Sequence, residues 1–191
     1  MTGKKMTLIL AATAMVLVGA VTVATAADAT FEGVGGCKMC HKKEKSGDQF
    51  GKWSAGPHAG AYATLASPEA KEAAAKLGID DPQKADACLK CHVTGHGADA
   101  ALLGKKYSVE DGVGCESCHG AGSEYKSMKV MKAITSGDTD GATVGLVTPT
   151  AETCTACHNE ESPTFKGFDY EEYSAKIAHP IPAEHKATYQ K

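Results

Sequence analysis

The segment Cys115-Glu116-Ser117-Cys118-His119 places two cysteines three residues apart and a histidine directly after the second. The same Cys-x-x-Cys-His pattern occurs at Cys37–His41, Cys88–His92 and Cys154–His158, and the four motifs use all eight cysteines of the chain. This spacing is typical of haem c attachment, in which two thiols add to the vinyl groups of one porphyrin and the histidine binds its iron. The sequence therefore predicts four covalently attached haem c groups. The attaching residues are Cys37, Cys40, Cys88, Cys91, Cys115, Cys118, Cys154 and Cys157, and the proximal ligands are His41, His92, His119 and His158.

Two other uses of cysteine pairs are weighed against haem. A zinc site requires two Cys-x-x-Cys pairs for each metal and gives no reason for a histidine after every second cysteine. Structural disulfides form in exported proteins, but a bridge between thiols three residues apart does little to staple a fold. The position of the four histidines therefore favours haem.

The first 26 residues resemble a signal peptide. Lys4 and Lys5 precede an apolar stretch from Met6 to about Val23, which ends in the cleavage signature Ala24-Thr25-Ala26. The alternative is an uncleaved membrane anchor, because the stretch is nearly long enough to span a bilayer. We expect cleavage, a mature domain at 27–191, no membrane span after cleavage, and a periplasmic or extracellular location. Export agrees with haem c, which is attached outside the cytoplasm.

Composition limits what else the protein can be. The mature domain provides only about 40 residues for each haem, aromatic residues make up 6% of the chain, and there are 21 glycines. Such a chain is expected to pack around its porphyrins, so that the haems form the core. A net charge of −3 argues against nucleic-acid binding, which requires a basic surface.

Local signals predict short helices joined by loops, with no strand periodicity. Ser67 and Pro68 begin a predicted helix that runs to Leu77, before Gly78. Ser123 is expected to cap a second helix, over residues 124–134. Asp169, with Glu172 three residues later, predicts a third helix that runs to about residue 178, before Pro180.

Several segments resemble the tetrahaem cytochrome c-554 family. They are Phe31-Glu32-Gly33, Trp53 followed by His58, the run from Cys88 to Gly95, and the run from Gly112 to Gly120. The resemblance covers nearly the whole mature chain. It implies a compact, mainly α multihaem cytochrome c fold with extensive loops, haems in closely stacked pairs, and a role in carrying electrons.

Four histidines remain once the proximal ligands are assigned: His58, His179, His96 and His185. Four haems and four spare imidazoles indicate bis-histidine ligation throughout. The family resemblance implies distal ligand roles for His58, which follows Trp53, and for His179, which precedes Pro180. His96 is a candidate ligand of a haem other than the second, or a solvent-exposed loop residue. His185 is a candidate ligand or a solvated residue near the terminus.

Three function classes follow. The first is a periplasmic electron shuttle between redox partner proteins, without catalytic residues. The second is a subunit of an extracellular cytochrome filament, in which His185 binds the iron of another copy. The third is a reductase of nitric oxide or another small molecule at an open haem. The number of spare histidines favours an electron carrier over an enzyme.

Overall fold

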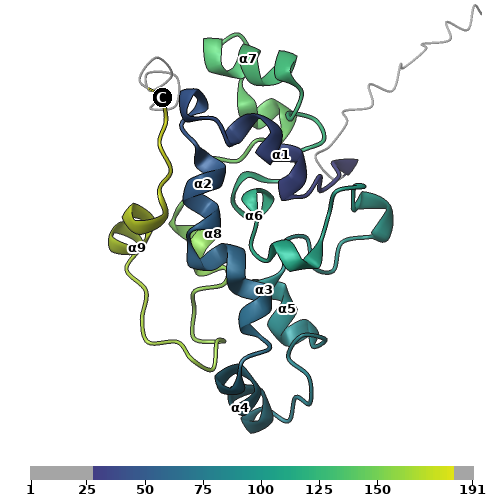
Figure 1. Ribbon diagram of the computed structural model, residues 1–191, viewed down its shortest axis with the longest axis vertical. Coiled ribbons are helices and arrows are strands. Elements are labelled where there is room, and N and C mark those ends of the chain that lie inside the picture. The colour runs from purple at the N-terminus through teal and green to yellow at the C-terminus, as the bar shows by residue number, and fades with distance from the viewer. Residues whose placement is uncertain (1–27, 183–191) are drawn as a thin grey trace, which may run out of the picture.

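The computed structural model describes residues 28–182, which are helical with extensive loops (Figure 1). The α-helices of this part of the chain are α1 (Val34–His41), α2 (Gln49–Ser54), α3 (Ala61–Thr64), α4 (Pro68–Lys76), α5 (Asp86–His92), α6 (Cys115–His119), α7 (Met128–Ser136), α8 (Ala151–Thr155) and α9 (Tyr170–Ile177). Strand pairing within these residues is limited to one isolated bridge between Phe31 and Leu103. The prediction of a mainly α fold with extensive loops is confirmed. The proposed signal peptide lies outside the described residues.

The helices are spread along one long axis. Figure 1 shows α1 and α7 near one end, α4 and α5 at the other, and α6 near the middle. Helix α1 contacts α2 and α6, and α3 contacts α5. Three of the helices that carry a Cys-x-x-Cys-His motif (α1, α6 and α5) are therefore distributed along the length of the molecule. None of the helices in residues 28–182 is both long and apolar enough to cross a membrane.

Two of the predicted helices begin where their capping residues indicate. The Ser67 hydroxyl accepts a hydrogen bond from the Ala70 N–H at 3.1 Å, and α4 starts at Pro68. The Asp169 carboxylate accepts from the Glu172 N–H at 2.8 Å, and α9 starts at Tyr170. Both predictions are confirmed, because a side-chain acceptor satisfies one of the free N–H groups at each helix start.

The prediction of a helix start at Ser123 is wrong. Helix α7 begins at Met128, where the Ser127 hydroxyl accepts from the Val130 N–H at 3.2 Å. Ser123 is instead bound to Thr30: its hydroxyl accepts from the Thr30 N–H at 3.0 Å, and its own N–H donates to the Thr30 carbonyl at 3.2 Å. A tertiary contact with a residue 93 positions away therefore overrides the local capping signal.

The described residues bury few apolar side chains. These are Ala29, Val34, Leu65, Ala74, Val93, Tyr125 and Ile134, together with the fully buried Pro82. No residue from 135 to 182 is buried, although this segment contains the fourth motif, α8 and α9. A segment of this length does not order itself without covering apolar surface. The polypeptide of this region therefore lacks a core of its own.

A buried carboxylate holds the third motif in place. Glu116, inside that motif, is 4% exposed. Its carboxylate accepts hydrogen bonds from the N–H groups of Glu32 at 2.8 Å, Gly33 at 2.8 Å and Gly122 at 2.7 Å. Glu116 thus joins the segment before α1 and the loop after α6 to the third motif. Backbone N–H groups on a buried carboxylate compensate the cost of removing its charge from water.

We expect Glu116→Gln to lower the free energy of unfolding by about 2–4 kcal/mol, because the amide presents an NH₂ group to backbone N–H groups that need an acceptor. Thermal and urea unfolding followed by circular dichroism measure the change. Glu160→Gln, at an exposed position, is the matched control and is expected to unfold like the wild type. Equal stability of Glu116→Gln and the control would show that the carboxylate does not hold these segments together.

Candidate functional site: four Cys-x-x-Cys-His motifs

Each motif forms a single helical turn. The first three occupy the ends of α1, α5 and α6, whose last residues are the motif histidines. The fourth starts inside α8, and the His158 N–H donates to the Cys154 carbonyl at 2.9 Å, so that the turn continues past the helix end. Residues at i, i+3 and i+4 lie on one helix face. Both thiols and the imidazole of a motif are therefore available to one ligand, and all eight cysteines are free thiols.

Thiol contacts bring motifs together that are distant in sequence. A hydrogen bond with the Cys115 thiol, followed by burial, raises the pKa of Cys37, and the same contact lowers the pKa of Cys115. Burial, followed by a hydrogen bond with Cys91, raises the pKa of Cys157 to about 12. The first motif thus touches the third, and the second touches the fourth.

Two thiols of different motif pairs lie close enough for their charges to interact. Burial, followed by the charges of Cys154 and Cys115, raises the pKa of Cys118. Cys118 belongs to the third motif and Cys154 to the fourth, so these motifs are neighbours. The motifs therefore follow one another in space in the order first, third, fourth, second. This order differs from their order along the chain.

Two spare histidines lie opposite motif histidines. The ring centres of His58 and His158 are 6.0 Å apart, and those of His119 and His179 are 5.8 Å apart. Two imidazoles that bind one metal ion from opposite sides, each through a bond of about 2 Å, have ring centres about 6 Å apart. Each pair therefore has the separation that a shared iron requires.

Burial favours the neutral imidazole of His58 and of His179. Burial, followed by the charge of His158, lowers the pKa of His58. Burial, followed by the charge of His119, lowers the pKa of His179. A neutral imidazole has a free nitrogen lone pair, which is the form that binds a metal. The Nδ1 atom of His179 is also buried and has no hydrogen-bond partner in the described residues.

Three motif histidines are oriented through Nδ1. The Nδ1 of His41 lies 3.2 Å from the Gln49 Oε1, that of His92 lies 2.7 Å from the Ala61 carbonyl, and that of His119 lies 3.0 Å from the Val147 carbonyl. Because all three partners are acceptors, each Nδ1 carries the proton and each Nε2 is left for a metal. Contacts of this kind fix the ring orientation and raise the basicity of a ligand.

The fourth motif histidine is oriented by an aromatic ring. Phe168 stacks on His158 with ring centres 4.7 Å apart and planes 16° apart. Tyr173 of α9 lies next to Phe168, with ring centres 5.3 Å apart. The loop before α9 thus covers one side of His158.

His58 is held by the segment that leads into the third motif. The Val113 N–H donates to the His58 carbonyl at 3.1 Å, and the Trp53 indole donates to the Val113 carbonyl at 2.8 Å. Gly112 has φ +63°, and a Cβ atom there would lie 2.8 Å from the His58 carbonyl oxygen. Only glycine fits so close an approach in this conformation.

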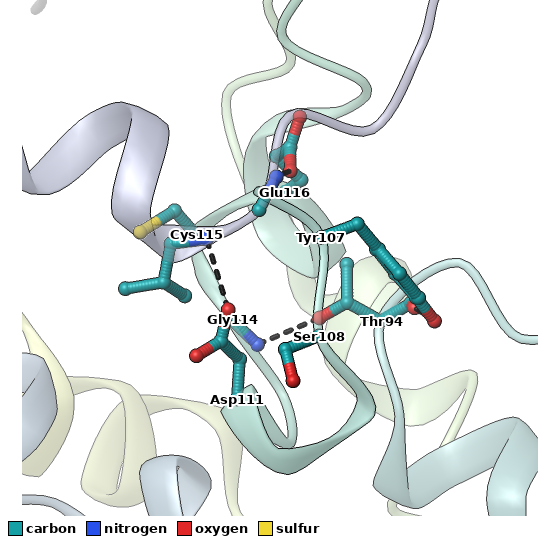
Figure 2. Close-up of a pocket in the computed structure, with 9 residues that line it drawn as sticks. Thr94, Tyr107, Ser108, Asp111, Gly114, Cys115 and Glu116 are labelled. Carbon is teal, nitrogen blue, oxygen red and sulfur yellow. Dashed lines mark hydrogen bonds between the residues drawn. The ribbon is translucent and has the colours of Figure 1, made fainter. Parts of the chain in front are cut away.

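The same segment is tied to the second motif. Figure 2 shows the Thr94 hydroxyl at the Gly114 N–H, from which it accepts at 2.7 Å, and Asp111 beside the start of the third motif. Thr94 is buried and lies two residues after His92. The Asp111 carboxylate accepts from the Val34 N–H at 3.2 Å, at the start of α1. The first three motifs are therefore joined through one turn.

His179 is held by a side chain next to the first motif. The Gln49 side chain bonds His41 through Oε1 and donates through Nε2 to the Pro180 carbonyl at 3.1 Å. Gly47 has φ +99°, and a Cβ atom there would lie 2.5 Å from the same carbonyl. The turn before α2 therefore positions the segment that brings His179 to His119.

The remaining candidate ligands are placed differently. The Nε2 of His96 lies 3.0 Å from the Asp86 Oδ1, within hydrogen-bond distance, at the start of α5. His185 lies outside the described residues. Within residues 28–182, no group of three or more His, Cys, Asp or Glu side chains is gathered around one point, as a structural zinc site requires.

Sequence reasoning missed the residues that orient the histidines. Ala61 and Val147 act through their backbone carbonyls, so the identity of their side chains gives no sequence signal for this role. Gln49, Phe168 and Glu116 have side chains that act on the motifs, but their roles depend on contacts between distant segments. Trp53 was recognised only as a neighbour of His58, and its bond to Val113 explains why the two occur together.

The residues present fit haem c. Eight free thiols lie on four helical turns with a histidine next to each pair, and two further imidazoles face motif histidines at the separation of axial ligands. The segment 135–182 contains no buried residue. The fourth motif lies in this segment and would attach a large apolar group there. The partnerless Nδ1 of His179 is a buried nitrogen beside a candidate iron site.

Comparison with known proteins gives a consistent result. The family described as cytochrome c554 and c-prime matches residues 36–120, which include the first three motifs and His58. Cytochrome c-554 of Nitrosomonas europaea is 34% identical over 159 residues, covering 74% of this chain and 63% of the relative. The match thus spans less than two thirds of that relative's length. No solved structure matches the chain. The family match, the identity to this relative and the helical fold together show that this chain is similar to the cytochrome c-554 family.

Proposed function

We propose that this protein carries electrons by means of four covalently attached haem c groups and works as a periplasmic shuttle between redox proteins. The observation that carries the proposal is the spatial row of four Cys-x-x-Cys-His motifs, in which Cys37 bonds Cys115, Cys91 bonds Cys157, and Cys118 lies within range of the charge of Cys154. Similarity to the cytochrome c-554 family supports the same function. A single haem exchanges one electron with an external partner, whereas a row of haems also moves that electron across the protein.

Each motif would hold one haem, numbered here by the order of the motifs in the chain. The two cysteines would form thioether bonds, and the histidine would bind the iron as proximal ligand. The bound haem supplies an iron that alternates between the ferric and ferrous states. The chain contributes the covalent anchors, the axial imidazoles and a surrounding structure that sets the reduction potential.

The axial ligands of two haems follow from the histidine pairs. His158 and His58 would bind haem 4, and His119 and His179 would bind haem 3. Haems 1 and 2 would have His41 and His92 as proximal ligands. His96 and His185 remain the candidates for their second ligands.

The motif contacts support a path from haem 1 through haems 3 and 4 to haem 2. Cys37 touches Cys115 at the first step, and Cys157 touches Cys91 at the last. Cys118 lies near Cys154 between them. Haems 1 and 2 would thus be the two ends of the row, and these ends correspond to α1 and α5, which lie toward opposite ends of the molecule (Figure 1).

A second candidate function is reduction of a small molecule at haem 2. Two observations favour it: in residues 28–182 no other histidine ring is in contact with His92, and His96 is bound to Asp86. An iron with one protein ligand would leave a position open. Electron paramagnetic resonance of the oxidised protein decides between the functions. A high-spin iron that binds nitric oxide would favour the reductase, whereas four low-spin irons favour the carrier.

The exported protein is expected to exceed the mass of its mature polypeptide by four haem increments, because every motif attaches one. Intact-mass spectrometry measures this, and extraction with acidic acetone is expected to release no haem. Cys115→Ala should lose the third attachment and unfold, since the porphyrin replaces side-chain packing. Thr155→Ala, inside a motif but not at an attaching position, is the control and should keep all four. A mass without haem increments would contradict the proposed cofactor.

His58→Ala and His179→Ala are each expected to convert one iron in four from low spin to high spin, because each removes one axial ligand. Electron paramagnetic resonance counts the converted iron, and the other three should keep their spectra. His58→Met is the control, since a thioether ligand should retain the low-spin state while raising the potential of that haem. An unchanged spin state in His58→Ala would show that this residue is not a ligand.

A further inference from the structure

A basic groove lies beside the first motif. It has a volume of about 630 Å³, and its lining includes Glu32 as well as Met39 and Cys40 of α1 and Lys105, Lys106 and Lys126. We refer to the last five of these residues as the basic groove. The groove runs between the outer face of α1 and two loops, one before Tyr107 and one before α7.

Two of the three groove lysines carry charge that no nearby carboxylate neutralises. Lys126 pairs with the Glu32 carboxylate, whereas Lys105 and Lys106 are exposed and have no carboxylate partner among residues 28–182. The Lys106 Nζ lies 3.3 Å from the Met39 sulfur. This concentration of positive charge stands out in a chain whose net charge is −3.

Further lysines extend the positive surface around the same helix end. Lys42, Lys43 and Lys45 follow α1 directly and are exposed. At the other end of the motif row, the balance of positive and negative charge differs. Asp86 of α5 is exposed, and Lys90 of the same helix is paired with Glu161. In the described residues, lysines without a carboxylate partner are therefore more numerous around α1 than on α4 and α5.

Cys40 connects the groove to the electron path. On the proposed function, on which this inference rests, Cys40 attaches haem 1, so the wall of the groove includes an attachment point of that haem. The lining residues of α1 are Gly36, Met39 and Cys40, whereas Cys37 and His41 are not among them, so the groove lies beside the helix face that would hold haem 1. Met39 is 63% exposed at the same place. Methionine is enriched in protein–protein interfaces, whose apolar core is surrounded by a polar rim.

We infer that the basic groove is the docking surface for an acidic redox protein that exchanges electrons with haem 1. Carboxylates on such a partner would pair with Lys105 and Lys106, and an apolar contact would cover Met39. Each exchange moves one electron between the partner and the iron: the donor is oxidised by one electron, the acceptor is reduced by one, and no bond forms or breaks. Attraction between opposite charges speeds the encounter and orients the partner at the haem edge.

The test measures electron transfer from an acidic flavodoxin in its hydroquinone form to the oxidised four-haem protein. The second-order rate constant of the wild type is expected to fall as salt is added. The double variant Lys105→Glu/Lys106→Glu should lower this constant about tenfold at low salt and remove most of its salt dependence. Lys71→Glu, on exposed α4 at the far end, is the control and should behave like the wild type.

Reduction by a neutral small molecule separates this inference from the proposed function. The double variant should accept electrons from that reductant at the wild-type rate, and its mass and haem absorbance should be unchanged. A wild type that the small molecule cannot reduce would contradict the proposed function itself. Equal flavodoxin rates in the wild type and the double variant would overturn the docking surface alone. Salt-sensitive self-association that the double variant abolishes would assign the groove to a second copy, and would also overturn the proposal.

Discussion

The shortage of buried apolar side chains in residues 28–182 is the constraint on which the other features of the structure depend. The few that are buried lie between residues 29 and 134, the part of the chain that contains the first three motifs, and the segment 135–182 has none. Porphyrins attached at the four motifs would provide the missing apolar volume. The chain is then free to use short helices and loops, since its main task is to hold each motif against the next.

The segments that hold the motifs are fixed by polar contacts rather than by side-chain packing. Glu116 binds three backbone N–H groups, Thr94 binds the turn before the third motif, and Gln49 joins His41 to the Pro180 carbonyl. Two of these residues lie within two positions of a motif histidine or cysteine. Disturbing such a contact would therefore move an axial ligand as well as weaken the fold. Stability and ligand geometry depend on the same hydrogen bonds.

The sequence was sufficient for features that depend on neighbours along the chain. The four motifs and the starts of α4 and α9 were all predicted from spacing and capping residues. The start of α7 was not, because Ser123 bonds Thr30 instead of capping a helix. The pairing of His58 with His158 and of His119 with His179 was also beyond sequence reasoning. Each pair joins residues 60 or more positions apart, and the Gly112 and Gly47 turns that bring them together act through backbone contacts.

The spatial order of the motifs is the central claim, because both the proposed electron path and the docking surface at haem 1 depend on it. Anomalous X-ray scattering at the iron absorption edge, from crystals of the exported protein, tests it most directly. We expect four iron peaks for each chain in the order first, third, fourth, second, with one peak between His58 and His158 and one between His119 and His179. Fewer than four peaks, irons away from both histidine pairs, or a zinc signal at the cysteines would contradict this account.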